Sequence, residues 1–163
     1  TVIPAKPKIT VILSGPEPQR SILEMLLIQQ SQTLDYDIVI VGGRPETDNK
    51  KDISQNITCI PFANSDQLQQ LIDSSTLLIC RSGYSSVMDM ACTGSKALFI
   101  PTPGQTEQLY LAHFHTIKDN AYSVQQEHLN LKVQIPEAMQ FNGFTREARN
   151  TELREAIGIL RKK

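Results

Sequence analysis

Short apolar runs alternate with longer amphipathic stretches along the chain. The runs are rich in β-branched residues and apolar at consecutive positions, which is typical of strands covered on both faces. They lie at Ile9–Leu13, Asp37–Val41, Ile57–Phe62, Thr76–Cys80, Ala97–Pro101 and, more weakly, Ala121–Val124. This pattern predicts a sheet of about six parallel strands.

The stretches between these runs carry apolar residues at helical spacing. The stripes include Ile22, Leu23, Leu26 and Leu27, then Leu68, Leu71 and Ile72, then Val87, Met90 and Ala91, and finally Leu109 and Ala112. We expect Asn64 or Ser65 to cap the second helix and Ser82 or Ser85 to cap the third, and a last helix to run from Thr145 toward the C-terminus. Strand–helix alternation predicts βαβ units with right-handed crossovers. The expected fold is α/β, a three-layer, Rossmann-like, doubly wound parallel sheet with helices on both faces.

Composition excludes several classes of protein. The 163 residues suit a single domain, and a net charge of −1 disfavours a polybasic nucleic-acid binder. No apolar run approaches the ~20 residues of a membrane span, and no secretory signal opens the chain. Cys59, Cys80 and Cys92 are scattered in apolar contexts, so we expect reduced, buried thiols in a cytoplasmic protein. With three histidines and no CxxC motif, a metal site is not expected.

Three turns that follow predicted strands contain glycine, at Ser14-Gly15, Ser82-Gly83 and Pro103-Gly104. In an open parallel sheet, ligands bind beyond the carboxyl ends of the strands. A glycine turn that leads into a helix N-terminus offers free N–H groups to a phosphate. Such glycines also occur simply because βα turns are tight, but three at one sheet edge favour a nucleotide-like ligand.

Polar side chains follow two of these turns. Ser85, Ser86 and Asp89 come after Gly83, and Asp89 suits a ribose diol as well as it suits an ordinary solvated carboxylate in an N-terminal turn. Gln105 and Gln108, with a glutamate between them, could recognise sugar hydroxyls or simply begin a polar helix.

No catalytic constellation stands out. The serines near Gly83 are not in a GxSxG motif, and the loop after the first strand reads SGPEPQR rather than GxGxxG or a Walker sequence. His113 and His115 are two residues apart, which places them on different faces of a helix. We expect surface or core histidines there rather than a general base.

The segment from residue 76 to residue 112 resembles the C-terminal donor domain of family 28 glycosyltransferases, the MurG-like GT-B enzymes. The resemblance rests on an apolar strand followed by an arginine-serine-glycine turn, a hydroxyl-rich first helical turn, an acidic residue, a glycine, a second strand ending in proline, and a glutamine-rich loop. These features are Arg81-Ser82-Gly83, Ser85-Ser86, Asp89, Gly94, Pro101, and Gln105 with Gln108.

The resemblance implies a role for each matching residue. Asp89 would hold the ribose hydroxyls of a UDP-sugar, the turn at Gly83 would face the diphosphate, and Phe62 with Ala63 would read the uracil edge. The glutamines would contact the donor sugar. The expected donor-binding residues are Ser14, Gly15, Phe62, Ala63, Arg81, Ser82, Gly83, Ser85, Ser86, Asp89, Gln105 and Gln108. The loop of Ser14 and Gly15 departs from the family's glycine-rich pattern, because its prolines lack N–H donors and Glu17 is negative.

The resemblance also implies half of a GT-B enzyme. We expect residues 1–163 to be one nucleotide-sugar-binding domain, the C-terminal half of a longer two-domain protein, since the chain begins with threonine rather than methionine. The parent would be an inverting, metal-independent, cofactor-free glycosyltransferase, inactive without the N-terminal half that carries the acceptor site and catalytic base. Half of a UDP-sugar epimerase, or a non-catalytic subunit docking a separate acceptor-binding partner, are the alternatives. Contact with the inner face of the membrane is expected only through the missing half.

Overall fold

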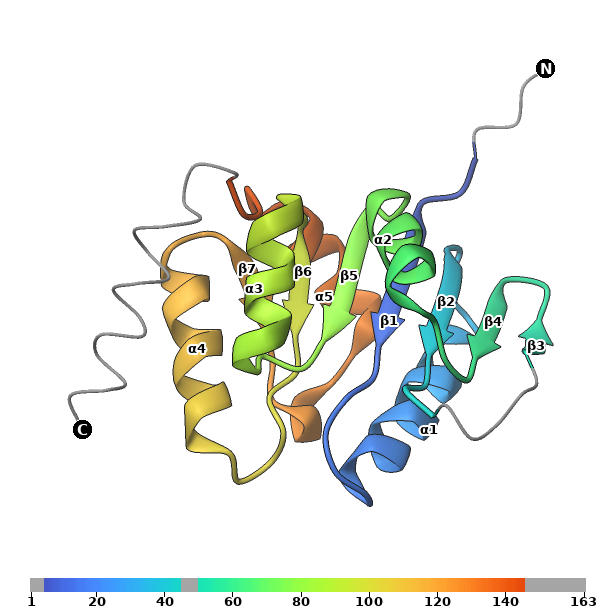
Figure 1. The fold of residues 1–163 in the computed structure, drawn as a ribbon, viewed down its shortest axis with the longest axis horizontal. Helices are drawn as coiled ribbons and strands as arrows, with labels where there is room; N and C mark the ends of the chain where they lie inside the picture. Colours follow the sequence, from blue (N-terminus) through green and yellow to red (C-terminus); the bar gives the residue numbers. More distant parts are fainter. Residues whose placement is uncertain (1–4, 45–49, 146–163) are drawn as a thin grey trace.

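The computed structural model describes residues 5–44 and 50–145, which form a seven-stranded sheet with helices on both faces (Figure 1). The strand order is β3-β4-β2-β1-β5-β6-β7. The strands are β1 (Lys8–Ile12), β2 (Asp37–Val41), β3 (Lys51–Ser54), β4 (Ile57–Ile60), β5 (Leu77–Cys80), β6 (Ala97–Phe99) and β7 (Ala121–Ser123). All neighbours pair in parallel except β3, which pairs antiparallel with β4.

The parallel strands have the doubly wound order. The chain starts at the centre with β1, runs outward through β2 and β4, and returns to the other side of β1 with β5. Ile9 therefore lies beside Ile38 on one side and Leu77 on the other. The strand order reverses between β1 and β5, and this switch point is where such sheets bind ligands. The predicted fold class is confirmed.

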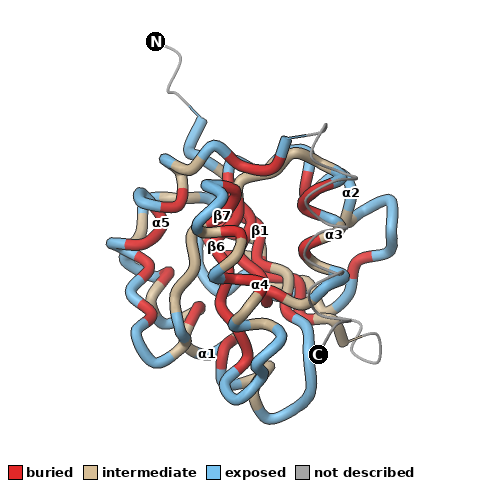
Figure 2. Tube along the Cα trace, turned by 90° about the vertical axis from the view of Figure 1, so that its left-hand side faces the viewer, coloured by how far each residue is buried: buried red, intermediate tan, exposed pale blue. Residues whose placement is uncertain are grey.

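The helices form two layers, one on each face of the sheet. They are α1 (Gln19–Ser31), α2 (Ser65–Asp73), α3 (Tyr84–Thr93), α4 (Thr106–Ile117) and α5 (Leu131–Met139), with a 3-10 turn η1 (Gln126–His128). Helices α1 and α5 contribute to one apolar core, and α2, α3 and α4 contribute to the other (Figures 1 and 2).

Strand β5 shows why the strand sequences are apolar throughout. Leu77 and Ile79 pack into the α1/α5 core, whereas Leu78 and Cys80 pack into the α2/α3/α4 core. Successive side chains of a strand point to opposite faces, so a strand between two helical layers buries every position. All four residues are buried.

Strand β3, helix α5 and the short η1 were not predicted. Strand β3 is exposed along its whole length, so it has no apolar pattern, and its position depends on pairing with β4 at the edge of the sheet. Helix α5 contains Pro136, which ordinarily argues against a helix interior. Its buried Leu131, Ile135 and Ala138 have the spacing of a helical stripe, and burial against the sheet outweighs the proline. The helix predicted from Thr145 onward lies outside the described residues.

The predictions of the helix caps and of the buried thiols are partly wrong. Asn64 caps α2 in a capping box with Gln67, as expected. Gly83, rather than a serine, stands at the N-cap of α3, because Ser82 is already inside the fold. Cys80 is buried, but Cys92 is exposed on α3.

The packing of α1 against the sheet predicts how substitutions on this helix change the free energy of unfolding. We expect Leu27→Ala to lower the free energy of unfolding by about 2–5 kcal/mol, because Leu27 is fully buried between α1 and the sheet. On the same helix, Met25→Ala should change it by less than about 0.5 kcal/mol, because Met25 is exposed. Urea denaturation measures both. Equal losses for the two variants would contradict the position of α1.

Candidate functional site

Loops from several strands meet at the carboxyl edge of the sheet. The turn after β1 contains Gly15, which has a φ of +91°, a conformation that favours glycine. A Cβ atom placed on Gly15 would lie 3.9 Å from Oγ1 of Thr102, which follows β6. The loop after β1 therefore lies against the loop between β6 and α4, across the end of β5.

Arg81 joins three of these segments from inside. Its side chain is almost completely buried, and its Nη1 donates to the carbonyl oxygens of Ile100 (3.1 Å) and Pro101 (3.2 Å). Its Nη2 donates to the carbonyl oxygen of Gln19 (3.2 Å), the first residue of α1. Burial lowers the pKa of Arg81 to about 10, so the guanidinium is charged at neutral pH. Arg81 thus links the turn after β5 to the segment after β6 and to the start of α1.

Ser82 and Gln108 connect α3 with α4. Ser82 is fully buried, and its hydroxyl donates to the carbonyl oxygen of Gln108 (2.7 Å). The side-chain Oε1 of Gln108 accepts from the backbone N–H of Thr102 (2.7 Å), and its Nε2 donates to Oε1 of Gln105 (3.3 Å). A Cβ on Gly83 would lie 3.9 Å from that Nε2 atom. The predicted residues Ser82, Gly83, Gln105 and Gln108 are therefore neighbours.

The N-terminus of α3 is open to an anion. Its N-cap is Gly83, no side chain of the described residues caps it, and its first turn contains no acidic residue. Ser85 is exposed and Ser86 half-buried in this turn, so hydroxyls lie beside the free backbone N–H groups. The helix dipole adds a partial positive charge at this end. These groups match the needs of a phosphate.

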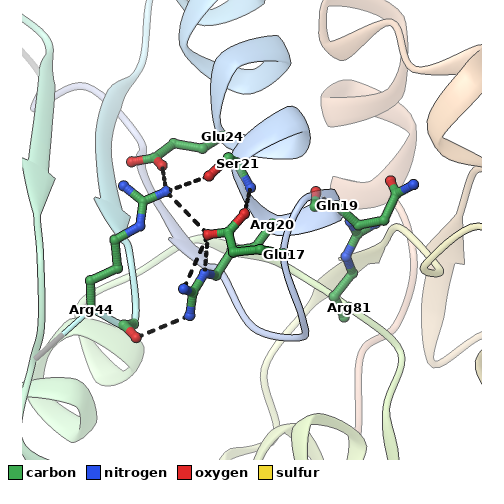
Figure 3. A network of polar contacts seen from close by, with 8 residues as sticks. Glu17, Gln19, Arg20, Ser21, Glu24, Arg44 and Arg81 are labelled. Atoms are coloured by element: carbon green, nitrogen blue, oxygen red, sulfur yellow. Dashed lines mark hydrogen bonds and ion pairs between the residues drawn. The ribbon is translucent and has the colours of Figure 1, made fainter.

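The N-terminus of α1 is closed by the chain's own carboxylate (Figure 3). Glu17 accepts from the backbone N–H of Ser21 (3.2 Å) and from Nε of Arg20 (3.1 Å). Arg44 contacts Glu17 at 3.8 Å and Glu24 at 2.6 Å. The hydrogen bond from Ser21 is the main reason that the pKa of Glu17 lies below its ordinary value. Glu17 thus accepts from one of the backbone N–H groups that are otherwise free at the N-terminus of α1.

Asp89 lies in a groove between α2 and α3. The groove has a volume of about 260 Å³ and is lined by Ser65, at the start of α2, and by Asp89 among others. Partial burial raises the pKa of Asp89 above its ordinary value. Phe62 is 51% exposed and Ala63 is buried in the segment that leads into α2. Of the predicted uracil and ribose residues, Asp89 lines this groove, whereas Phe62 and Ala63 precede Ser65, the groove residue at the start of α2.

Sequence reasoning missed Thr102 and the contacts of Gln19 and Glu17. Thr102 is buried between two prolines and carries no motif, so only the folded chain places it beside Gly15 and Gln108. Gly15 lies beside Thr102, and Ser14 precedes it in the same turn.

The histidines do not form a reactive pair. His115 is buried beside the rings of Phe99, Phe114 and Phe144, and its Nδ1 lies 3.1 Å from Nδ2 of Asn120, whereas His113 is exposed. Within residues 5–44 and 50–145, no three His, Cys, Asp or Glu side chains are grouped to hold a metal ion. None of the described helices is long and apolar enough to cross a membrane.

Known proteins share both sequence and fold with this chain. Residues 12–157 match the glycosyltransferase family 28 C-terminal domain. A relative from Nostoc punctiforme (strain ATCC 29133 / PCC 73102) is named UDP-N-acetylglucosamine--N-acetylmuramyl-(pentapeptide) pyrophosphoryl-undecaprenol N-acetylglucosamine transferase. It is 32% identical over 101 residues, which are 60% of this chain and 27% of the relative. The chain thus spans little more than a quarter of the curated relatives it matches, 28% and 27% of their lengths.

Two solved structures have the same fold. MurG of Acinetobacter baumannii superposes with a TM-score of 0.63 at 18% identity, over 97% of this chain and 50% of that one. The solution structure of ALG13 superposes with a TM-score of 0.64 at 12% identity, over 94% of each chain. The family match extends over most of the chain and includes the whole switch-point edge. The chain therefore belongs to the family of glycosyltransferase family 28 C-terminal domains.

Proposed function

We propose that the chain is the UDP-sugar donor-binding domain of an inverting, metal-independent glycosyltransferase. The observation that carries this proposal is the open N-terminus of α3 at the switch point, beside the linked side chains of Gln105 and Gln108. The curated relatives are named for transfer from UDP-N-acetylglucosamine, which makes uridine diphosphate sugars the donor class to test first.

The diphosphate binds at α3 rather than at α1. Backbone N–H groups of the first turn of α3 and the hydroxyls of Ser85 and Ser86 donate to the phosphate oxygens. At the corresponding end of α1, Glu17 already accepts a hydrogen bond from the backbone N–H of Ser21, which leaves that group unavailable to a phosphate. Binding of the diphosphate by N–H groups at a helix N-terminus needs no cluster of basic residues. It is therefore compatible with the net charge of −1.

The nucleoside lies over the groove between α2 and α3. The carboxylate of Asp89, an exposed residue that lines the groove, accepts charge-assisted hydrogen bonds from the two ribose hydroxyls. The exposed ring of Phe62 and the backbone at Ala63 flank the uracil. Asp89 and the open helix end belong to the same helix, α3, so one element holds both ribose and diphosphate.

Transfer requires groups that we assign to a second domain or partner. An acceptor hydroxyl oxygen attacks the anomeric carbon from the face opposite UDP, and the bond from that carbon to the β-phosphate oxygen breaks. The electron pair leaves with UDP, which α3 stabilises, and the acceptor proton passes to a base outside this domain. The chain alone is then expected to bind the donor without transferring the sugar.

A second candidate is a separate donor-binding subunit that docks an acceptor-binding partner chain. The match with ALG13 favours it, because 94% of each chain superposes and a solved chain of nearly this length has the same fold. Both candidates require the same donor site. They differ in whether the acceptor-binding part is covalently attached, which the length of the purified native protein decides.

Calorimetric titration with UDP tests the donor site. We expect wild type to bind UDP with a Kd below ~1 mM, and Asp89→Asn to weaken binding about tenfold or more, because two charge-assisted hydrogen bonds are weakened. Inorganic pyrophosphate should bind both proteins equally, since Asp89 does not contact phosphate. Asp37→Asn, an exposed aspartate at the opposite end of the strands, is the matched control. A folded wild-type protein that does not bind UDP would overturn the proposal.

The raised pKa of Asp89 predicts how UDP binding depends on pH. Binding needs the ionised carboxylate, so affinity should fall as the pH drops through the pKa of Asp89. Because burial raises that pKa, the fall should begin at a higher pH than for an ordinary aspartate of pKa about 3.9. Measuring the UDP affinity of wild type and of Asp89→Asn across this pH range distinguishes protonation of Asp89 from protonation of the UDP phosphates. Parallel pH profiles for the two proteins would show that Asp89 does not hold the ligand.

A further inference from the structure

Helix α4 carries an apolar stripe beside its buried face. The helix lies at the end of the molecule next to β7, and no other described helix lies outside it (Figures 1 and 2). Tyr110, Phe114 and Ile117 follow one another along α4 at helical spacing. Tyr110 and Phe114 are half-buried, and their ring centroids lie 6.3 Å apart, whereas Ile117 is 69% exposed. We call these three residues the α4 stripe.

The α4 stripe is more than a single exposed side chain. Exposed hydrophobic residues are common on protein surfaces one at a time, but Ile117 continues a stacked aromatic pair. The ammonium group of Lys118 lies 5.8 Å from the centroid of the Phe114 ring and packs on the same surface. A row of apolar side chains along a surface helix indicates that another element packs there.

The described part of the chain ends beside this stripe. Phe144 is 5% exposed, and its ring centroid lies 5.0 Å from that of His115 on α4. The side chain of Asn142 donates a hydrogen bond to Asp119, which comes two residues after the end of α4. The chain therefore reaches the end of its described part close to the C-terminal end of α4, where Ile117 lies.

The sequence after residue 145 has the apolar pattern needed to cover the α4 stripe. Apolar residues recur there at helical spacing among polar ones, at Leu153, Ala156, Ile157 and Leu160. An α-helix rises about 1.5 Å per residue, so a helix over residues 146–163 would span about 27 Å, against about 18 Å for the twelve residues of α4. The family match extends to residue 157, so most of this segment belongs to the matched domain.

We propose that residues 146–163 pack along the α4 stripe as an amphipathic helix antiparallel to α4. Because the segment starts near the C-terminal end of α4, a helix that lies along α4 must run toward its N-terminal end. The segment then supports the helix that carries Gln108 of the proposed donor site. The inference concerns packing within the domain and does not rest on the proposed UDP-sugar function.

Nuclear Overhauser effects in the full 163-residue chain test the contact directly. We expect cross-peaks between the methyl groups of Leu153, Ile157 and Leu160 and the rings of Tyr110 and Phe114. In a mixture of isotope-labelled and unlabelled chains, filtered spectra that detect contacts between chains should lack these cross-peaks. Their presence would mean that a second copy covers the stripe, and this would overturn the proposal. An assigned spectrum without any cross-peak between the segment and the stripe would overturn it as well.

Ile117→Asp tests the same contact through stability. On an uncovered stripe, aspartate at a position that is 69% exposed leaves the melting temperature nearly unchanged. A covered stripe predicts a fall of about 2–4 °C or more, because a charge is then placed in an apolar contact. Met25→Asp is the matched control, since Met25 on α1 is also 69% exposed, and it should change the melting temperature little. Equal effects of the two substitutions would overturn the proposal.

Ile157→Asp tests the contact from the side of the segment. It should lower the melting temperature as Ile117→Asp does, whereas Thr151→Asp, on the opposite side of the expected helix, should not. Because both isoleucines belong to one contact, the double variant should lose less than the sum of the two single losses. Additive losses, or no loss in Ile157→Asp, would overturn the proposal. Neither result touches the donor site, which titration with UDP decides separately.

Discussion

The buried guanidinium of Arg81 is the interaction on which the site depends. A buried charge is tolerated only when it is hydrogen-bonded, and here the carbonyl groups of Ile100, Pro101 and Gln19 accept from it. These carbonyls belong to the end of β6 and the start of α1, while Arg81 itself follows β5. One side chain thus ties together the segments on both sides of the switch point. Removing it would leave several carbonyls and a loop junction without support.

The helix N-termini around this junction differ in whether a side chain accepts hydrogen bonds from their free backbone N–H groups. Glu17 closes α1 and Asn64 closes α2, whereas α3 begins at a glycine with no cap from the described residues. The chain therefore supplies acceptors of its own to the N-termini of α1 and α2, whereas the N-termini of α3 and α4 have no side-chain cap among the described residues. The groove of Asp89 lies beside α3.

The sequence predicts those strands in which every position is buried. Continuous β-branched runs identify the strands of the parallel sheet, because both faces are covered. Strand β3 has no such signal, since it is exposed and depends on its neighbour, and Pro136 hides the helical stripe of α5. Within the site, motif spacing places Gly83 and Asp89 on the correct helix. It does not reveal that Arg81 and Ser82 turn inward, because burial depends on segments far away in the chain.

By itself, the sequence determined the α/β class, the family and the sheet edge that carries the polar residues, because periodicity and local motifs encode these features. The tertiary structure alone decided that Arg44, which follows β2, reaches Glu17 and Glu24 at the start of α1, because these segments meet only in the assembled sheet. It also decided that Thr102 and Gln126 share a cavity, although 24 positions separate them in the sequence. Hydrogen-bond satisfaction at a buried atom is a property of all its neighbours in space, and most of those neighbours are remote in the chain.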